Sequence, residues 1–314
     1  MPRPIVKTAL QTLGHTEDLK SGIVKPEGFQ FAFEEVPKII QAFRRMVRGQ
    51  EFDVSEMAIT TYLCAKAHGK PFTALPIFLV RAFHHGAILC NTTLGIDTPK
   101  DLEGRRVGIS RGYTVTTGVW ARSVLQHEHG VDLSKITWVL SGDEHVQEFR
   151  PPANVVSAPA GRALEEMLAA GEIAAAIGIS LDHPDVRPLI PDAEAVGLAA
   201  LRRDGYYPIN HTLVVKDSLL AAKPELAADL FAAFAEAKQR YLTRMRDGLI
   251  AEPTKTDRLY RKVMDIAGDP LPYGVEPNRP MIEAVIRHAR EQNILLRPLV
   301  VEELFATGTL ELAA

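Results

Sequence analysis

Short strand-like runs alternate with longer helical patterns from the start of the chain, and this alternation constrains the fold more than any other feature. Residues 5–10 and 29–36 have the apolar content of buried strands, whereas residues 38–48 place apolar side chains at helical spacing. Strands that alternate with helices in this way are typical of a sheet whose strands run mostly parallel. The sequence therefore predicts an α/β protein.

The alternation of strand and helix patterns continues along the chain as far as residue 216. After residue 216 the pattern is almost wholly helical, with the apolar stripes of amphipathic helices. We expect further strands at residues 75–83, 87–91, 106–109, 136–140, 174–179 and 211–216, and further helices at residues 58–68, 114–129, 163–170, 223–245, 256–266 and 279–292.

Two turn-rich segments indicate that the chain crosses twice between two lobes. The first contains Thr98 and Pro99, which suit the N-cap and the first residue of a short helix, and the second contains residues 204–208. A cleft between two such lobes is where a small ligand would bind. The crossings predict a discontinuous first lobe, residues 1–97 plus 212–314, and an inserted second lobe, residues 98–211.

The composition excludes several classes of partner. Of the 314 residues, 46% are hydrophobic and 24% are charged, as in an ordinary globular protein. Lys and Arg number 36 against 39 Asp and Glu, a net charge of −3, and no stretch gathers five like charges. Binding to nucleic acid or to an anionic membrane requires a basic surface, so we expect neither. The expected partner is a small molecule, and a homo-oligomer stays open.

Cysteine usage and the N-terminus bear on the location of the protein. Cys64 and Cys90 are the only cysteines, too few for a disulfide framework or a thiolate metal site, and we expect both to act as small buried hydrophobes. The first ten residues lack the apolar stretch of a secretory signal, and no run of ~20 apolar residues could span a bilayer. We therefore expect a cytoplasmic location, unless a leader was removed.

Four phrases of the sequence resemble a known family. The stretch Thr98-Pro-Lys-Asp-Leu-Glu-Gly-Arg-Arg-Val-Gly108 resembles the domain-crossing signature of type II periplasmic-binding-protein folds. Three more, Leu19-Lys-Ser-Gly22, Arg111-Gly-Tyr-Thr-Val-Thr-Thr-Gly-Val-Trp-Ala-Arg122 and Tyr207-Pro-Ile-Asn-His-Thr212, are similar to the 4,5-dihydroxyphthalate decarboxylase family. The resemblance spans nearly the whole chain. It implies a two-lobed, periplasmic-binding-protein-like fold and a cytoplasmic carboxy-lyase that acts on a dihydroxylated aromatic diacid.

Loss of a carboxylate from a catechol ring requires three kinds of group. A proton must be added to the ring carbon that carries the carboxylate, while the para hydroxyl supplies electron density. The site therefore needs an acid, a base and a clamp for the anionic substrate. Histidine is the natural acid or base near neutral pH. The arginine fork matches a planar carboxylate with two parallel hydrogen bonds.

Three histidines and one glutamate are the candidate catalytic residues. His15 lies in the loop after the first predicted strand, His85 lies at the end of a buried strand, and His211 lies at the second crossing. Glu56 ends another predicted strand and could orient a histidine or accept the catechol proton. Each has a structural alternative, such as a solvated loop histidine at position 15 or a helix cap at position 56. The sequence does not assign acid and base among them.

Four residues are the candidate substrate-binding groups. Arg81 ends a buried strand, where an unpaired charge is expensive and a function for it is favoured. Arg111, Tyr113 and Thr114 lie between a strand and a helix that begins near residue 116, so backbone donors and the helix dipole favour a bound anion. The alternative is a plain helix cap by Thr114.

Cofactor and rival functions complete the prediction. The sequence has no Gly-x-Ser-x-Gly nucleophile elbow and no phosphate-binding loop that ends in Gly-Lys-Ser/Thr. It also has no Gly-x-Gly-x-x-Gly dinucleotide-binding motif after a strand and no His-Glu-x-x-His zinc-protease motif. We expect no organic cofactor, because the para hydroxyl can supply the electrons. A divalent metal that bridges the catechol oxygens stays open, although the spacing of His127, His129 and His145 matches no metal site. Two rivals also stay open: a solute-binding protein for an aromatic carboxylate, and another enzyme of this fold such as a chorismate-derived dehydratase.

Overall fold

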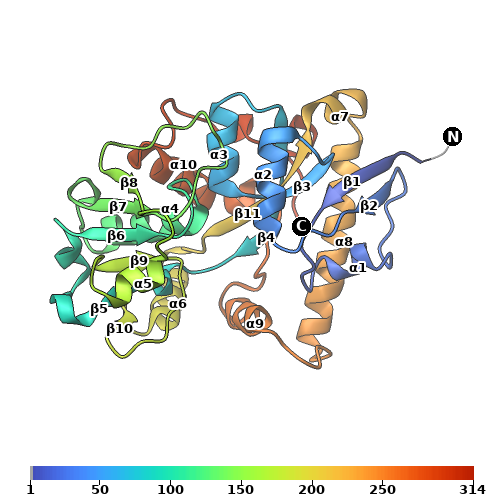
Figure 1. Ribbon diagram of the computed structural model, residues 1–314. Helices are drawn as coiled ribbons and strands as arrows, with labels where there is room; N and C mark the ends of the chain where they lie inside the picture. The colour runs from blue at the N-terminus through green and yellow to red at the C-terminus, as the bar shows by residue number, and fades with distance from the viewer. Residues whose placement is uncertain (1–2) are drawn as a thin grey trace. The chain divides into compact units, whose positions relative to one another are not determined.

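The computed structural model describes residues 3–314, which divide into two compact units, each with one sheet. Figure 1 shows the elements of both. Unit 1 comprises the described residues up to Arg81 together with His211–Glu283 and Leu299–Ala314, and unit 2 comprises Ala82–Asn210 and Ala284–Pro298.

The first boundary lies between Arg81 and Ala82, whereas the sequence predicted it near residue 97. Strand pairing explains the difference, because β5 (Ile88–Asn91) is antiparallel to β9 (Ala175–Ile177) and β10 (Val186–Pro188) in the sheet of unit 2. An apolar run shows that a strand is buried but not which sheet receives it. Residues 284–298, which were predicted in the first lobe, also belong to unit 2.

The sheet of unit 1 has the order β2-β1-β3-β11-β4. β1 is parallel to β2 and β3, and β11 is antiparallel to β3, so the carboxyl ends of β1 and β3 share an edge with the start of β11. The strands are β1 (Ile5–Ala9), β2 (Gln30–Phe33), β3 (Val54–Ala58), β4 (Phe72–Arg81) and β11 (Ile209–Lys216).

The helix α8 (Leu226–Arg246) provides much of the core of unit 1. Its apolar stripe, which includes Leu230 and Phe234, packs with Val6, Leu75 and Leu213 of the strands in one buried cluster. A stripe at this spacing directs one face of a helix to a sheet and leaves the other face to solvent. The remaining helices are α1 (Glu17–Lys20), α2 (Ile39–Gly49), α3 (Ile59–Ala67), α7 (Asp217–Ala222) and α9 (Lys255–Ala267).

The sheet of unit 2 has the order β10-β5-β9-β6-β7-β8, with β6, β7, β8 and β9 parallel. A cluster around Val139, Leu168 and Ala176 packs helix against sheet. The remaining elements are β6 (Arg106–Ile109), β7 (Thr137–Leu140), β8 (Val155–Ser157), α4 (Thr116–Ser123), α5 (Leu164–Ala169), α6 (Ala193–Asp204) and α10 (Arg279–Glu291).

The predicted alternation of strands and helices is confirmed, with two kinds of difference. The sequence did not predict β8, β10, α1, α6 or α7, whose short or weakly periodic patterns give little signal. The predicted helix at residues 114–129 is α4 followed by a π-helical turn, Val124–Glu128. Within residues 3–314, no helix has both the length and the apolar character needed to cross a bilayer.

Candidate functional site

A carboxylate–histidine pair lies at the strand edge of unit 1. Glu56 Oε1 is 2.6 Å from His211 Nδ1, and Glu56 Oε2 accepts a hydrogen bond from the Gln11 backbone at 3.0 Å. Glu56 is fully buried, whereas the His211 side chain keeps 18% of its surface exposed. A carboxylate oxygen accepts hydrogen bonds, so His211 Nδ1 is the donor in its contact with Glu56.

Strand register explains why these two residues meet. Leu213 of β11 is opposite Glu56 of β3, and His211 is opposite Ala58. Residues two apart on a strand project from the same face, so His211 and Glu56 are diagonal neighbours on adjacent strands. Phe43 packs edge-on against the imidazole at 5.0 Å between ring centroids. The pair therefore has a defined orientation.

His15 is buried in the same unit, in the loop after β1. Only 1% of its surface is exposed, and within residues 3–314 its Nε2 atom has no hydrogen-bond partner. Burial lowers the pKa of His15 from 6.5 to about 4, although the charge of Glu56 and a backbone hydrogen bond at Leu79 act in the opposite direction. His15 is therefore neutral at pH 7, a state that can accept a proton.

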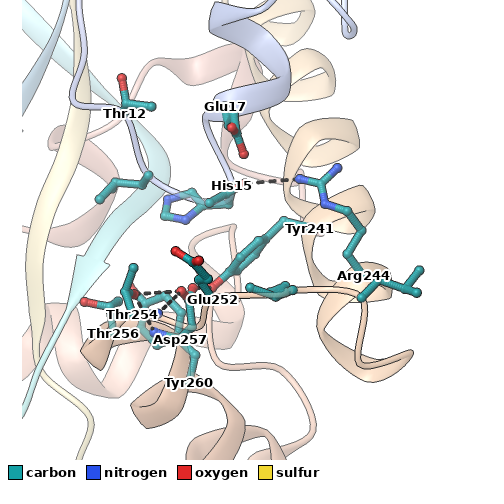
Figure 2. A pocket seen from close by; sticks show the side chains of 14 residues that line it. Thr12, His15, Glu17, Tyr241, Arg244, Glu252, Thr254, Thr256, Asp257 and Tyr260 are labelled. Carbon is teal, nitrogen blue, oxygen red and sulfur yellow. Dashed lines mark hydrogen bonds between the residues drawn. The ribbon is translucent and has the colours of Figure 1, made fainter.

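A pocket of about 490 Å³ borders His15, within the usual range for small-ligand sites. Figure 2 shows His15 with Tyr241, Asp257 and Tyr260 around this pocket. Tyr241 donates to Asp257 Oδ1. Burial acts to raise the pKa of Asp257, but hydrogen bonds from Tyr241 and Thr254 outweigh it and lower that pKa.

The charge of this pocket does not suit a dicarboxylate by itself. Glu17, Glu252 and Asp257 line it, and its one arginine, Arg244, is already bound to Asp18 at 2.9 Å. A diacid among three carboxylates would meet repulsion and not attraction. A dicarboxylate of the kind expected from the sequence would therefore require other groups to bind it.

Arg81 ends β4 and is held in place by amide groups. Its Nη1 atom donates to Asn278 Oδ1 at 2.7 Å, and the Asn278 amide nitrogen donates to the carbonyls of Pro272 and Gly274. The charges of Arg81 and Glu56 both act on Tyr260, whose pKa burial raises. The structure thus brings Arg81, His15, Glu56 and His211 into one neighbourhood of unit 1.

His85 belongs to unit 2 and also has a glutamate partner. Its Nε2 atom is 3.0 Å from Glu128 Oε1, and the ring is fully buried. Among the described residues its Nδ1 atom has no hydrogen-bond partner. The structure therefore separates His85 from His15 and His211 by unit, although all three are candidate catalytic histidines.

The predicted anion-binding loop of unit 2 holds a carboxylate of the chain itself. The backbone nitrogens of Tyr113 and Thr114 and the Thr114 hydroxyl donate to Glu144, with distances of 3.2 Å for the Thr114 nitrogen and 2.6 Å for the hydroxyl. The loop before α4 thus donates hydrogen bonds to a carboxylate of the chain itself, and binding of a ligand anion there stays a prediction.

The backbone of this loop is shaped for that close approach. A Cβ atom on Gly112 would lie 2.6 Å from Glu144 Oε2, so a larger residue there would require the Glu144 carboxylate to move. Arg111 has φ 71°, a left-handed conformation, and its nitrogen donates to Ser141 Oγ at 2.8 Å. Burial lowers the pKa of Arg111.

A buried arginine, Arg122, contacts the same loop through Tyr113. Arg122 is fully buried, donates through Nη2 to the Tyr113 carbonyl at 2.7 Å and stacks over the Tyr113 ring at 3.9 Å. Its Nε atom donates to Gln292 at 2.7 Å. Because its charge also acts on Glu144, the loop combines backbone donors with a fixed cation.

Sequence reasoning missed four of these groups. Glu144 follows the predicted strand at residues 136–140, and the adjacent carboxyl ends of β6 and β7 could have pointed to it. Asp257 completes a capping box with Thr254 that the sequence shows. Glu128 gave no signal, since its partner His85 lies 43 residues away in the sequence. Arg122 ends one of the phrases that resemble the family, but the sequence does not show its contacts with Tyr113 and Gln292.

Solved structures define the class of fold. No family model matches the chain. The chain is similar to the periplasmic aliphatic sulphonate binding protein SsuA from Escherichia coli, with a TM-score of 0.52 and 11% identity over 98% of this chain and 99% of that chain. It is also similar to the desulfurization enzyme DSZB, solved as a mutant in complex with biphenyl-2-sulfinic acid, with a TM-score of 0.55 and 15% identity over 97% of each chain. The predicted periplasmic-binding-protein-like fold is thereby confirmed.

Curated relatives identify the family within that class. A 4,5-dihydroxyphthalate decarboxylase from Comamonas testosteroni is 31% identical over 288 residues, which cover 86% of this chain and 87% of that protein. One from Pseudomonas putida is 34% identical over 168 residues, which cover 49% of this chain and 65% of that protein. The chain belongs to the 4,5-dihydroxyphthalate decarboxylase family, as the four sequence phrases indicated.

Proposed function

We propose that this protein is a carboxy-lyase that converts 4,5-dihydroxyphthalate, or a similar dihydroxylated aromatic diacid, to a dihydroxybenzoate and CO2. The observation that carries the proposal is the relationship to the Comamonas testosteroni decarboxylase over 288 residues. The histidine–carboxylate groups of the site supply the chemistry that this reaction requires.

Proton transfer is assigned to unit 1. Neutral His15, with a pKa of about 4, accepts the proton of the hydroxyl para to the departing carboxylate. His211, oriented by Glu56, donates a proton to the ring carbon, and Glu56 compensates the charge of its imidazolium form. The carbon–carboxylate bond then breaks, its electron pair returns to the ring, and CO2 leaves. One proton is consumed for each carboxylate lost.

Substrate recognition is assigned to the arginines and the loop before α4. Arg111 and the backbone of Tyr113 and Thr114 bind the carboxylate that stays, and Arg81 steers the second. The hydrogen bonds from this loop to the Glu144 carboxylate support the assignment. In this proposal the substrate replaces Glu144 on the same donors.

The proposal includes no organic cofactor. The para oxygen supplies the electrons that a cofactor would otherwise supply or store, so acid, base and anion clamp suffice. A divalent metal that bridges the two catechol oxygens would add to this scheme. Turnover is measured after dialysis against a chelator, with and without added metal. This comparison distinguishes a mechanism without a metal from one that requires a divalent metal.

The direct test is incubation with 4,5-dihydroxyphthalate while CO2 and dihydroxybenzoate are measured together. We expect equal amounts of the two products, and a large loss of both with His211→Gln. The matched control is His129→Gln, the same change at an exposed histidine outside the site. Loss of substrate without CO2 would contradict the proposal.

Binding without turnover would favour the solute-binding alternative, which shares the fold with SsuA. Turnover of another ring acid, with none of the diacid, would favour a different enzyme of the same fold. The cytoplasmic location belongs to the proposal as well, and cell fractionation with an antibody to the native protein tests it.

A further inference from the structure

Three side chains that can bind a metal meet in unit 2, and none of them is among the groups assigned above. His127 lies in the π-helical turn Val124–Glu128, and His288 and Glu291 lie one turn apart at the end of α10. Their donor atoms all lie within 4.8 Å of one another. His127 Nε2 is 2.7 Å from Glu291 Oε2, and His288 Nδ1 is 3.4 Å from the same oxygen.

These separations are close to those of ligands around one ion. Zinc binds imidazole nitrogen and carboxylate oxygen at about 2.0–2.2 Å, which puts neighbouring ligand atoms of a tetrahedron roughly 3.4 Å apart. The distance from His288 Nδ1 to Glu291 Oε2 already has that value. The distance from His127 Nε2 to the same oxygen is shorter, because these two atoms are joined by a hydrogen bond. Side-chain rotations that lengthen the His127 to Glu291 distance from 2.7 Å to that value would admit an ion.

The surroundings hold the cluster and leave room for water. Trp120 packs edge-on against His288 at 5.4 Å between centroids, which orients the ring. A cavity of about 180 Å³ borders Glu291 and Gln126. Within residues 3–314, Gln126 Oε1 is buried without a hydrogen-bond partner, so it can accept a hydrogen bond from a water on the ion.

We propose that His127, His288 and Glu291 bind one divalent transition-metal ion, best matched by Zn²⁺, with water as the fourth ligand. Two imidazoles and one carboxylate form a recognised zinc ligand set, whereas Mg²⁺ and Ca²⁺ prefer ligands that are all oxygen. The ion would tie the end of α10 to the turn after α4. None of these three residues has a role in the proposed decarboxylase chemistry, although Tyr113 lines the same cavity.

The test is calorimetric titration of untagged, chelator-treated full-length protein with ZnCl2 alone. We expect one saturable site per chain and much weaker heat with MgCl2. His127→Gln and Glu291→Gln should each raise the dissociation constant at least ~10-fold, because loss of even an outer-shell partner has an effect of that size. The matched control, His129→Gln, should bind as the wild type does.

Cobalt provides an independent readout. Co²⁺ bound through nitrogen and oxygen ligands absorbs visible light, and the band should disappear in His127→Gln but persist in His129→Gln. His127 is the preferred position because it is exposed, whereas the buried His288 contributes to packing. Equal zinc binding by wild type and His127→Gln, or no saturable binding by wild type, would overturn the site. Neither experiment involves substrate, so its outcome is independent of the decarboxylase proposal.

Discussion

The loop before α4 and the loop that carries His15 differ in how their polar groups are satisfied. In unit 2, the backbone donors of Tyr113 and Thr114 have an acceptor within the chain, Glu144. In unit 1, His15 Nε2 is buried with no partner among the described residues. A ligand that binds the loop before α4 would have to displace the Glu144 carboxylate. A ligand that reaches His15 would supply the missing hydrogen bond.

This difference has energetic consequences. A buried polar atom without a partner costs about 1–3 kcal/mol, a free energy that a ligand can recover on binding. Exchange of Glu144 for a substrate carboxylate recovers far less, because one charge-assisted set of hydrogen bonds replaces another. The two loops therefore differ in what a ligand would gain: a missing hydrogen bond at His15, and the exchange of one carboxylate for another at the loop before α4.

The largest effect should come from His211→Gln in unit 1. Loss of a positioned proton donor lowers kcat by ~10²–10⁴-fold, while KM changes little because substrate binding is assigned elsewhere. Steady-state kinetics with His129→Gln as the control measures the difference. If KM rises and kcat stays, His211 binds substrate and the assignment of roles to the two units is wrong.

The next effect should come from Arg111→Ala in unit 2. Removal of a charged clamp on a carboxylate should weaken diacid binding by ~2–4 kcal/mol, with little change in the free energy of unfolding. Equilibrium binding and urea denaturation of the same variant measure both quantities. Unchanged affinity would locate the carboxylate on another group, with Arg81 the next to test.

The stability of unit 1 should depend on pH through His15. Its folded pKa, about 4, lies below the ordinary 6.5, so its contribution to stability is complete above pH 6.5 and is lost as the pH falls toward 4. The loss amounts to ~3 kcal/mol. His15→Gln should therefore lose less stability than wild type between pH 7 and pH 4 in urea denaturation. Parallel curves for the two proteins would show that His15 is not the buried neutral group described.

The smallest effect should come from Glu144→Gln. A neutral amide competes for the loop donors less well than a carboxylate, by about 1 kcal/mol, so the variant should bind the diacid roughly fivefold more tightly. Titration with the diacid at constant ionic strength measures the change. Weaker binding would mean that Glu144 builds the loop and is not exchanged.

Local patterns predicted the elements of the fold well, because hydrophobic periodicity is a local property. The strand at Arg106–Ile109 has the predicted bounds, and α2 differs by one residue at each end. The destination of β5 was not predictable, since it depends on pairing with strands about 90 residues later. Long-range pairing leaves no periodic trace in the sequence.

The candidate site was predictable in its donors but not in its acceptors. Arg111, Tyr113 and Thr114 precede a helix, a local arrangement that indicates anion binding. Glu144, which occupies those donors, lies about 30 residues further along the chain. The Glu56–His211 contact spans 155 residues, so the sequence supplied both residues without showing that they touch.

The π-helical turn after α4 makes three consecutive residues sensitive to insertion and deletion. Gln126 borders a cavity, His127 contacts Glu291, and Glu128 contacts His85. A π turn accommodates one residue more than an α turn, and each residue of an α-helix turns the chain by about 100°. Deletion of a single residue here would let the helix continue in regular α geometry and rotate His127 and Glu128 away from their partners together. The number of residues in this turn, more than the identity of any one side chain, keeps two histidine contacts in place.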